Sequence, residues 1–129
     1  MTATQPKKIL IVDDDPSILL TLKHLLKVPG VEVLACDVIE QAEEALSNSH
    51  FDLVISDIRM SGVDSIEGLE LLNFVKQRYD TEVIIMTGLG SAEIEEEAYR
   101  LGAYHFFNKP IDISNLMLKV SELGIPVRL

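Results

Sequence analysis

The chain alternates short apolar runs with longer segments of helical periodicity, and this alternation limits the folds that it can adopt. The runs are rich in β-branched residues and lie at positions 9–12, 31–36, 53–56, 83–86 and 104–107. After each run, apolar residues recur every three or four positions, as on the buried face of a helix. Runs that are apolar on both faces need cover on both sides. The pattern therefore predicts an α/β domain whose parallel sheet has helices on both faces.

Capping residues mark the ends of two of the predicted helices, those after the first and fourth apolar runs. Asp15 followed by Pro16 is typical of an N-cap and a first helical position. Ser91 can cap a later helix, and Gly102 suits the left-handed position that ends it. Both of these helices therefore have a periodic apolar face and a defined start, and the later one also has a defined end.

The size and composition fit a single domain. The 129 residues, of which 47% are hydrophobic and 25% are charged, can bury an ordinary core without disulfides. We assign residues 1–129 to one domain, with a flexible N-terminus at 1–7 and a tail or the start of a linker at 124–129. The single cysteine, Cys36, has no internal partner, and we expect a buried thiol in a reducing compartment.

Charge and hydropathy argue against several classes of function. The net charge of −10 would repel a nucleic-acid backbone, so no direct contact with nucleic acid is expected. The N-terminal residues lack the apolar run of a signal peptide, and no segment approaches the roughly 18 apolar residues of a membrane span. We therefore expect a cytoplasmic protein without membrane contact.

Polar residues follow four of the five apolar runs. They are Asp13 with Asp14, Asp57, Thr87 with Gly88, and Lys109. The carboxyl ends of parallel strands meet at one edge of a sheet, where such folds bind ligands, so we expect these residues to converge. Three neighbouring carboxylates repel one another. A hard divalent cation would offset that repulsion, which predicts a site for Mg²⁺, with Mn²⁺ as an alternative.

Four stretches also stand out together: "ILIVDDDPS", "FDLVISDIRM", "VIIMTG" and "GAYHFFNKP". In their order and spacing they resemble one known family, the receiver domains of bacterial two-component response regulators. The resemblance covers nearly the whole chain and is greatest for receivers that precede an ATPase-type transcriptional activator. It implies a doubly wound, flavodoxin-like (βα)5 domain with strand order 2-1-3-4-5.

The resemblance assigns the acidic residues to phosphoryl transfer. Asp57 would accept the phosphoryl group from a phosphohistidine. Asp14, Asp57 and the main-chain carbonyl of Arg59 would bind Mg²⁺, with Asp13 acting through a water molecule. Such a protein is a phosphorylated signalling domain and not an enzyme, since it catalyses only its own phosphotransfer and slow autodephosphorylation.

The same resemblance gives the remaining site residues a role after phosphorylation. Lys109 would pair with one phosphoryl oxygen, and Thr87 would bond to another with help from the Gly88 amide. Phe106 matches the family's switch aromatic, which moves inward behind the threonine. This movement would alter the surface made by the fourth helix, fifth strand and fifth helix. The Lys109–Pro110 bond would be cis.

Partners and signal lifetime are implied in the same way. The phosphodonor would be a sensor histidine kinase or a phosphotransfer protein, and the recipient an output domain or a partner protein. A phosphorylation-dependent homodimer is a further expectation. Arg59 and Leu89 occupy two positions that tune loss of the phosphoryl group in the family. Leu89 offers an attacking water no hydrogen bond and Arg59 can crowd its approach, so we expect slow hydrolysis.

The loop after the expected acceptor departs from the family's pattern. Ser61 stands where receivers usually have proline, and additional residues precede Gly68. The conformation of the loop at 61–67 therefore stays open, while the assignment of the acceptor does not depend on it.

An enzyme of another class is the alternative interpretation. Haloacid-dehalogenase-type phosphohydrolases also begin with an apolar strand followed by Asp-x-Asp, and Asp13 with Asp15 has that spacing. Such enzymes normally carry a cap and a late acidic pair, which this short chain lacks, and Asp57 would have no role in one. Phosphorylation of Asp57 would favour the receiver, and turnover lost in Asp13→Asn would favour the hydrolase.

Overall fold

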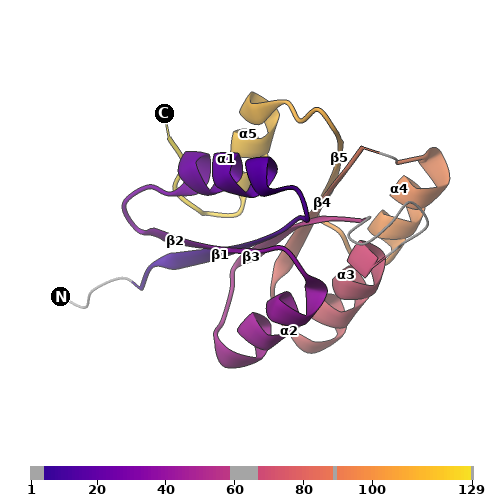
Figure 1. The fold of residues 1–129 in the computed structure, drawn as a ribbon, viewed down its shortest axis with the longest axis horizontal. Helices are drawn as coiled ribbons and strands as arrows, with labels where there is room; N and C mark the ends of the chain where they lie inside the picture. The colour runs from indigo at the N-terminus through magenta and orange to yellow at the C-terminus, as the bar shows by residue number, and fades with distance from the viewer. Residues whose placement is uncertain (1–4, 59–66, 89, 129) are drawn as a thin grey trace.

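Five β-strands alternate with five α-helices in the computed structural model of the chain, which describes residues 5–58, 67–88 and 90–128 (Figure 1). The strands are β1 (Lys7–Val12), β2 (Val31–Cys36), β3 (Leu53–Asp57), β4 (Glu82–Thr87) and β5 (His105–Asn108). The helices are α1 (Pro16–Leu26), α2 (Ile39–Asn48), α3 (Glu67–Arg78), α4 (Ala92–Arg100) and α5 (Ile113–Glu122). Each predicted apolar run overlaps one of the strands.

The strands form one parallel sheet in the order β2-β1-β3-β4-β5, which is the predicted order. β1 begins earlier than the predicted run at 9–12. Lys7 and Lys8 pair with Val31 and Glu32 of β2 through the backbone, which does not require apolar side chains. β2 lies on one side of β1 and β3 lies on the other, so the direction in which strands are added reverses at β1. A crevice for a ligand is therefore expected at the carboxyl ends of β1 and β3.

Helices cover both faces of the sheet. Helices α1 and α5 lie on one face, and α2, α3 and α4 lie on the other (Figure 1). The side chains of β1 alternate between the two cores: Leu10 and Val12 pack on one side, and Ile9 and Ile11 pack on the other. All four are completely buried. This burial explains why the run is apolar at every position instead of at every second one.

The predicted caps are present. The Asp15 side chain accepts a hydrogen bond from the backbone N–H of Ser17, and the Ser91 hydroxyl accepts one from the N–H of Ile94. Gly102 follows α4 with a φ of 104°, a conformation that glycine adopts without strain. No helix within the described ranges combines the length and hydropathy that crossing a membrane requires.

The last described residues pack against the domain. Gly124, with a φ of 79°, turns the chain after α5. Ile125 is 2% exposed and joins the core beneath α1 and α5. Arg128 donates hydrogen bonds to the carbonyl oxygens of His24, Leu25 and Lys27. These carbonyls end α1 and have no partner within the helix, so Arg128 caps α1 from a distant part of the chain.

Candidate functional site

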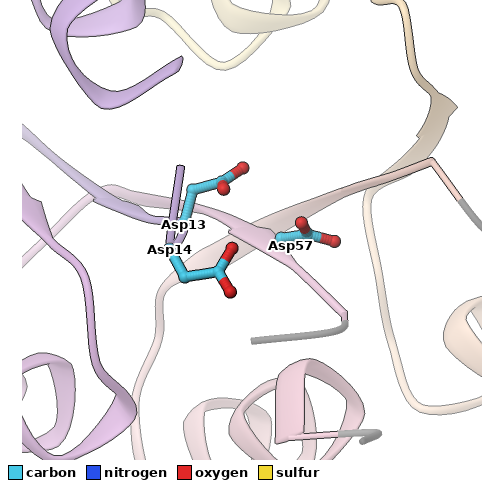
Figure 2. Close-up of side chains that lie close together, drawn as sticks. All are labelled: Asp13, Asp14 and Asp57. Atoms are coloured by element: carbon cyan, nitrogen blue, oxygen red, sulfur yellow. The ribbon is translucent and has the colours of Figure 1, made fainter. Parts of the chain in front are cut away.

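Three carboxylates meet at the carboxyl ends of β1 and β3. Asp13 and Asp14 follow β1 directly, and Asp57 is the last residue of β3. One carboxylate oxygen from each lies within 4.8 Å of the others, and Figure 2 shows the three side chains gathered at this edge. Asp13 and Asp57 are buried, whereas Asp14 is exposed. The cluster is therefore open to solvent on the Asp14 side.

Lys109 brings a positive charge into this cluster. Its Nζ atom lies 2.8 Å from Oδ2 of Asp13 and 2.9 Å from Oδ2 of Asp57. The lysine follows β5, and its backbone N–H donates to the carbonyl oxygen of Thr87 at the end of β4. The Lys109–Pro110 peptide bond is cis, as expected. The loop after β5 thus directs the ammonium toward the acidic residues.

Burial and pairing set the charge of these groups. Burial raises the pKa of Asp13, and this effect outweighs the hydrogen bonds that the carboxylate accepts from Lys109 and from the N–H of Asp15. Burial lowers the pKa of Lys109, but its hydrogen bonds to Asp13 and Asp57 prevail, so the pKa of this ammonium is raised overall. Lys109 therefore stays charged in its partly buried position.

The donor set suits a divalent metal ion. When all four groups are ionised, one ammonium cannot neutralise three carboxylates, and two negative charges remain. Carboxylate oxygens are the ligands that Mg²⁺ prefers, and the exposed side at Asp14 leaves room for the waters that Mg²⁺ retains. The acidic group could thus hold such an ion.

The other predicted site residues lie around this cluster. Thr87 ends β4 and is 1% exposed. A Cβ atom built on Gly88 would meet only the Cβ atom of Lys109, at 4.0 Å, so Gly88 lies beside the lysine in an otherwise open space. Phe106 lies in β5 and packs in the core on the α4 side, with only 5% exposed. Its ring is therefore inside the domain in this structure.

Gly68 is a neighbour of the site to which the sequence assigned no role. It lies in the first turn of α3, where its N–H donates to the carbonyl oxygen of Ile58 at 2.9 Å. A Cβ atom at this position would overlap the carbonyl oxygen of Asp57 and the Cα atom of Ile58. Helix α3 can therefore approach the backbone of Asp57 only because residue 68 lacks a side chain. The signal in the sequence for this close approach is a glycine within a segment of helical periodicity.

Asp15 does not join the cluster. Its carboxylate accepts hydrogen bonds from the N–H and the hydroxyl of Ser17, at 2.9 and 2.8 Å, and caps α1. The pair of carboxylates that the phosphohydrolase alternative requires is therefore not assembled. Two further predicted positions, Arg59 and Leu89, lie outside the described residues, as does most of the loop at 61–67.

An apolar groove adjoins the cluster. It has a volume of about 500 Å³ and runs between α1 and the segment after β5. Its lining includes Ile18 and Leu22 from α1, and Pro110 and Ile113 from the segment after β5. Lys109 also lines the groove, so one side chain contacts both the groove and the carboxylates.

Comparison with protein families gives one match that covers most of the chain. A family model described as the response regulator receiver domain matches residues 9–121. Among curated proteins, the chain is 36% identical over 121 residues to the C4-dicarboxylate transport transcriptional regulatory protein DctD of Pseudomonas aeruginosa. That alignment covers 94% of this chain and 26% of DctD. The chain spans about a quarter of the length of the first curated relatives that it matches.

Solved structures give the same picture. The chain is similar to a CheY-like response regulator receiver domain protein from Methanospirillum hungatei JF-1, with 33% identity and a TM-score of 0.83. That match covers 93% of this chain and 95% of the other. It is also similar to a beryllofluoride-activated NtrC4 receiver domain dimer, with 28% identity and a TM-score of 0.81. The second match covers 90% of this chain and 94% of the other.

Proposed function

The chain belongs to the response regulator receiver domain family, and from this premise we propose that it receives a phosphoryl group on Asp57 from a histidine kinase or a phosphotransfer protein. Receiver domains act in two-component signalling, so its role is in signalling and not in the turnover of a separate substrate. The phosphohydrolase alternative has no support, because the match covers the chain from residue 9 to residue 121 and Asp15 caps a helix.

One observation supports this proposal most strongly: Asp57 shares the ammonium of Lys109 with Asp13, and it lies in one acidic cluster with Asp13 and Asp14. Phosphoryl transfer depends mainly on positioning and on stabilising charge. A Mg²⁺ ion held by Asp14, Asp57 and the carbonyl of Arg59, with Asp13 acting through water, would neutralise charge on the phosphoryl oxygens. Lys109 is already within 2.9 Å of Asp57 and needs only a small movement to pair with one of those oxygens.

The transfer itself follows from these positions. A carboxylate oxygen of Asp57 attacks phosphorus while the nitrogen–phosphorus bond of the donor's phosphohistidine breaks. The electron pair of that bond stays on the imidazole nitrogen. The apolar groove beside Lys109 is the place where the donor would lie, because a side chain there reaches both the groove and Asp57.

The product would then act on Thr87 and Phe106. A phosphoryl group adds strong acceptors and more negative charge at Asp57. The Thr87 hydroxyl and the Gly88 N–H would donate to it, and Phe106 would fill the space behind Thr87. The buried Phe106 ring in this structure fits that arrangement. The readout would be a changed surface on α4, β5 and α5.

We also propose a cytoplasmic protein whose output is gene regulation. DctD is named as a transcriptional regulatory protein. The similar NtrC4 receiver is a dimer in its beryllofluoride-activated form. A phosphorylation-dependent homodimer through the same surface would link phosphorylation of this domain to an output domain or a partner protein.

The experiment that tests the acceptor uses a small-molecule phosphodonor. The parent protein, incubated with phosphoramidate and Mg²⁺, should gain one phosphoryl group that hydroxylamine removes, as measured by intact mass. Asp57→Asn should gain none, because its amide is not a nucleophile for this reaction. Asp52→Asn is the matched control, since Asp52 precedes the same strand at its opposite end. Label on the Asp57→Asn protein at the parent's level would rule out Asp57 as the acceptor.

A further inference from the structure

β5 is an edge strand, and one of its backbone N–H groups bonds to a helix instead of a strand. Within the described part of the chain, β5 pairs only with β4. The N–H of Phe106 donates a hydrogen bond to the hydroxyl oxygen of Tyr99, at 3.1 Å. Tyr99 lies in the last turn of α4, and 41% of it is exposed. Edge strands carry N–H groups that no neighbouring strand can satisfy, so Tyr99 satisfies one of them at the expected switch residue.

The Tyr99 hydroxyl has a second neighbour in His105. Its oxygen lies 3.5 Å from Nδ1 of His105, and the two rings meet edge to face. A hydroxyl can accept one hydrogen bond and donate another. Tyr99 can therefore accept from Phe106 and direct its own hydrogen toward His105, provided that Nδ1 carries no proton. At this distance the second bond is weak.

The surroundings of His105 favour its neutral form. Burial lowers the pKa of His105, and Lys119 of α5 acts in the same direction. Glu122 of α5 and Glu95 of α4 oppose this effect, but the pKa is lowered overall. The imidazole also packs against the ring of Phe107, with 4.5 Å between the ring centroids. His105 is thus unprotonated at neutral pH.

The ring of Phe106 lies close to Gly90 and Thr87. A Cβ atom built on Gly90 would lie 2.9 Å from Cζ of Phe106 and 3.0 Å from Cγ2 of Thr87. The tip of the ring and the methyl group of Thr87 therefore approach the same point beside Gly90. Phe106 is thus tied to α4 through its N–H and contacts the β4–α4 loop through its ring.

We propose that Tyr99 is a positioning residue of the switch, whose hydroxyl holds the end of α4 on Phe106 and favours the inward position of that ring beside Thr87. The inference rests on the proposed function, in which Thr87 and Phe106 form the switch. Movement of α4 away from β5 must break this hydrogen bond, so the bond shifts the balance between the two ring positions. When His105 is protonated, its Nδ1 atom is a donor and can no longer accept the hydrogen of the Tyr99 hydroxyl. This change weakens the hold of the hydroxyl on Phe106.

The test removes the hydroxyl and retains the ring. Tyr99→Phe is compared with the parent by the NMR shift of the Thr87 γ2 methyl group, which the ring current of Phe106 displaces while the ring is inward. Loss of one neutral hydrogen bond should lower the ratio of inward to outward ring by about two- to tenfold, so the displacement should shrink. Tyr104→Phe is the matched control, because the Tyr104 hydroxyl donates to Glu122, and Tyr104 packs against the core on the face of the sheet opposite to that of Phe106.

A pH titration separates positioning from a general loss of stability. From about pH 8 to about pH 5 the Thr87 methyl of the parent should move toward its position in Tyr99→Phe, as His105 becomes protonated. The Tyr99→Phe protein should lack this transition. His105→Gln, which keeps an acceptor but cannot be protonated, should lack it as well and stay near the parent's shift at high pH.

The outcomes are distinct from those of the proposed function. A Thr87 methyl that is the same in Tyr99→Phe and the parent, or a parent-like transition in either variant, would overturn the role of Tyr99. Should Tyr99→Phe not fold, the titration of His105→Gln against the parent decides alone. These measurements need no phosphoryl group. If beryllofluoride leaves the spectrum of the parent unchanged, the proposed function fails, whatever Tyr99 does.

Discussion

Lys109 is the residue on which the charge balance of the site depends. Its ammonium is shared between Asp13 and Asp57, and this sharing keeps it protonated although the side chain is partly buried. An ammonium on a flexible stem can move from a carboxylate to a phosphoryl oxygen without losing its charge. The lysine therefore stabilises the acidic cluster, and in the proposed transfer it would be in reach of the phosphoryl group.

Gly68 should be intolerant of even the smallest side chain. Alanine within a helix normally stabilises by up to about 1 kcal/mol relative to glycine. At position 68, however, the added Cβ would overlap the backbone of Asp57 and Ile58, and such overpacking costs about 1–3 kcal/mol or more. Urea unfolding should show Gly68→Ala to be less stable than the parent. Gly88→Ala, with open space around it, should differ little, and a Gly68→Ala protein as stable as this control would contradict the expected clash.

The lifetime of the phosphoryl group should depend on Arg59 and Leu89. We expect the double variant Arg59→Asn with Leu89→Glu to lose its phosphoryl group faster, because the approach of water is less crowded and gains a hydrogen-bonding group. Each tenfold change in rate corresponds to about 1.4 kcal/mol in the barrier, which one side chain can supply. The measurement is the decay of phosphorylated protein in Mg²⁺. Arg100→Asn with Leu118→Glu, two exposed residues on α4 and α5, is the control. Decay that is unchanged or slower in the first pair would refute the account.

Among the elements, α1 connects the site with the end of the described chain. Its N-terminus is capped by Asp15, whose N–H donates to the Asp13 carboxylate. Its C-terminus is capped by Arg128, from a segment that packs between α1 and α5. The C-terminal residues described here are thus part of the domain's packing, and the structure places them against α1 and not away from it.

This packing predicts a stability cost for changes in the C-terminal segment. Ile125→Ala should lower the free energy of unfolding by about 2–5 kcal/mol, since it removes a buried side chain and leaves a cavity. Arg128→Ala should lower the free energy of unfolding by about 1 kcal/mol, because three carbonyl groups at the end of α1 then bond to water in place of the guanidinium. Chemical unfolding measures both values. Lys23→Ala, on the exposed face of α1, is the control, and an Ile125→Ala protein no less stable than this control would show that the segment does not support the fold.

At the scale of the whole molecule, negative charge exceeds positive charge, and part of the positive charge is paired away from the site. The net charge is −10. Among the described residues, Lys7, Lys8, Lys76, Arg100 and Lys119 each lie within 4.0 Å of a carboxylate away from the site. Of the described cations, only Lys109 has a salt bridge to the carboxylates of the site, through Asp13 and Asp57. A divalent ion would stabilise the folded domain by balancing the charge of these carboxylates.

Mg²⁺ should accordingly raise the melting temperature. A ligand that binds only the folded state adds about 2.7 kcal/mol when its concentration is 100 times Kd. Asp14→Asn should abolish the effect, because it removes a charged ligand from the open side of the cluster. Asp37→Asn is the matched control, since Asp37 follows β2 at the same edge of the sheet but lies outside the cluster. A melting temperature that does not respond to Mg²⁺, or that responds equally in Asp14→Asn, would contradict the metal site.

Local patterns predict much of this molecule, because the forces behind them act over a few residues. The strands, the helices and the caps at Asp15 and Ser91 follow from periodicity and from backbone hydrogen bonding within one turn. The convergence of Asp13, Asp14 and Asp57 could also be expected, since parallel strands end at one edge. The roles of these residues came from the resemblance to receiver domains and not from the pattern.

Contacts between residues that are distant in the sequence could be found only in the tertiary structure. The close approach of α3 to Asp57 at Gly68, the bond from Phe106 to Tyr99 and the cap that Arg128 places on α1 join residues whose distance is set by how helices pack on the sheet. No local pattern encodes such a distance, because it depends on every side chain in the layer between. Tyr99 and His105 are ordinary surface residues in the sequence, and they become partners only when α4 lies along the edge of β5.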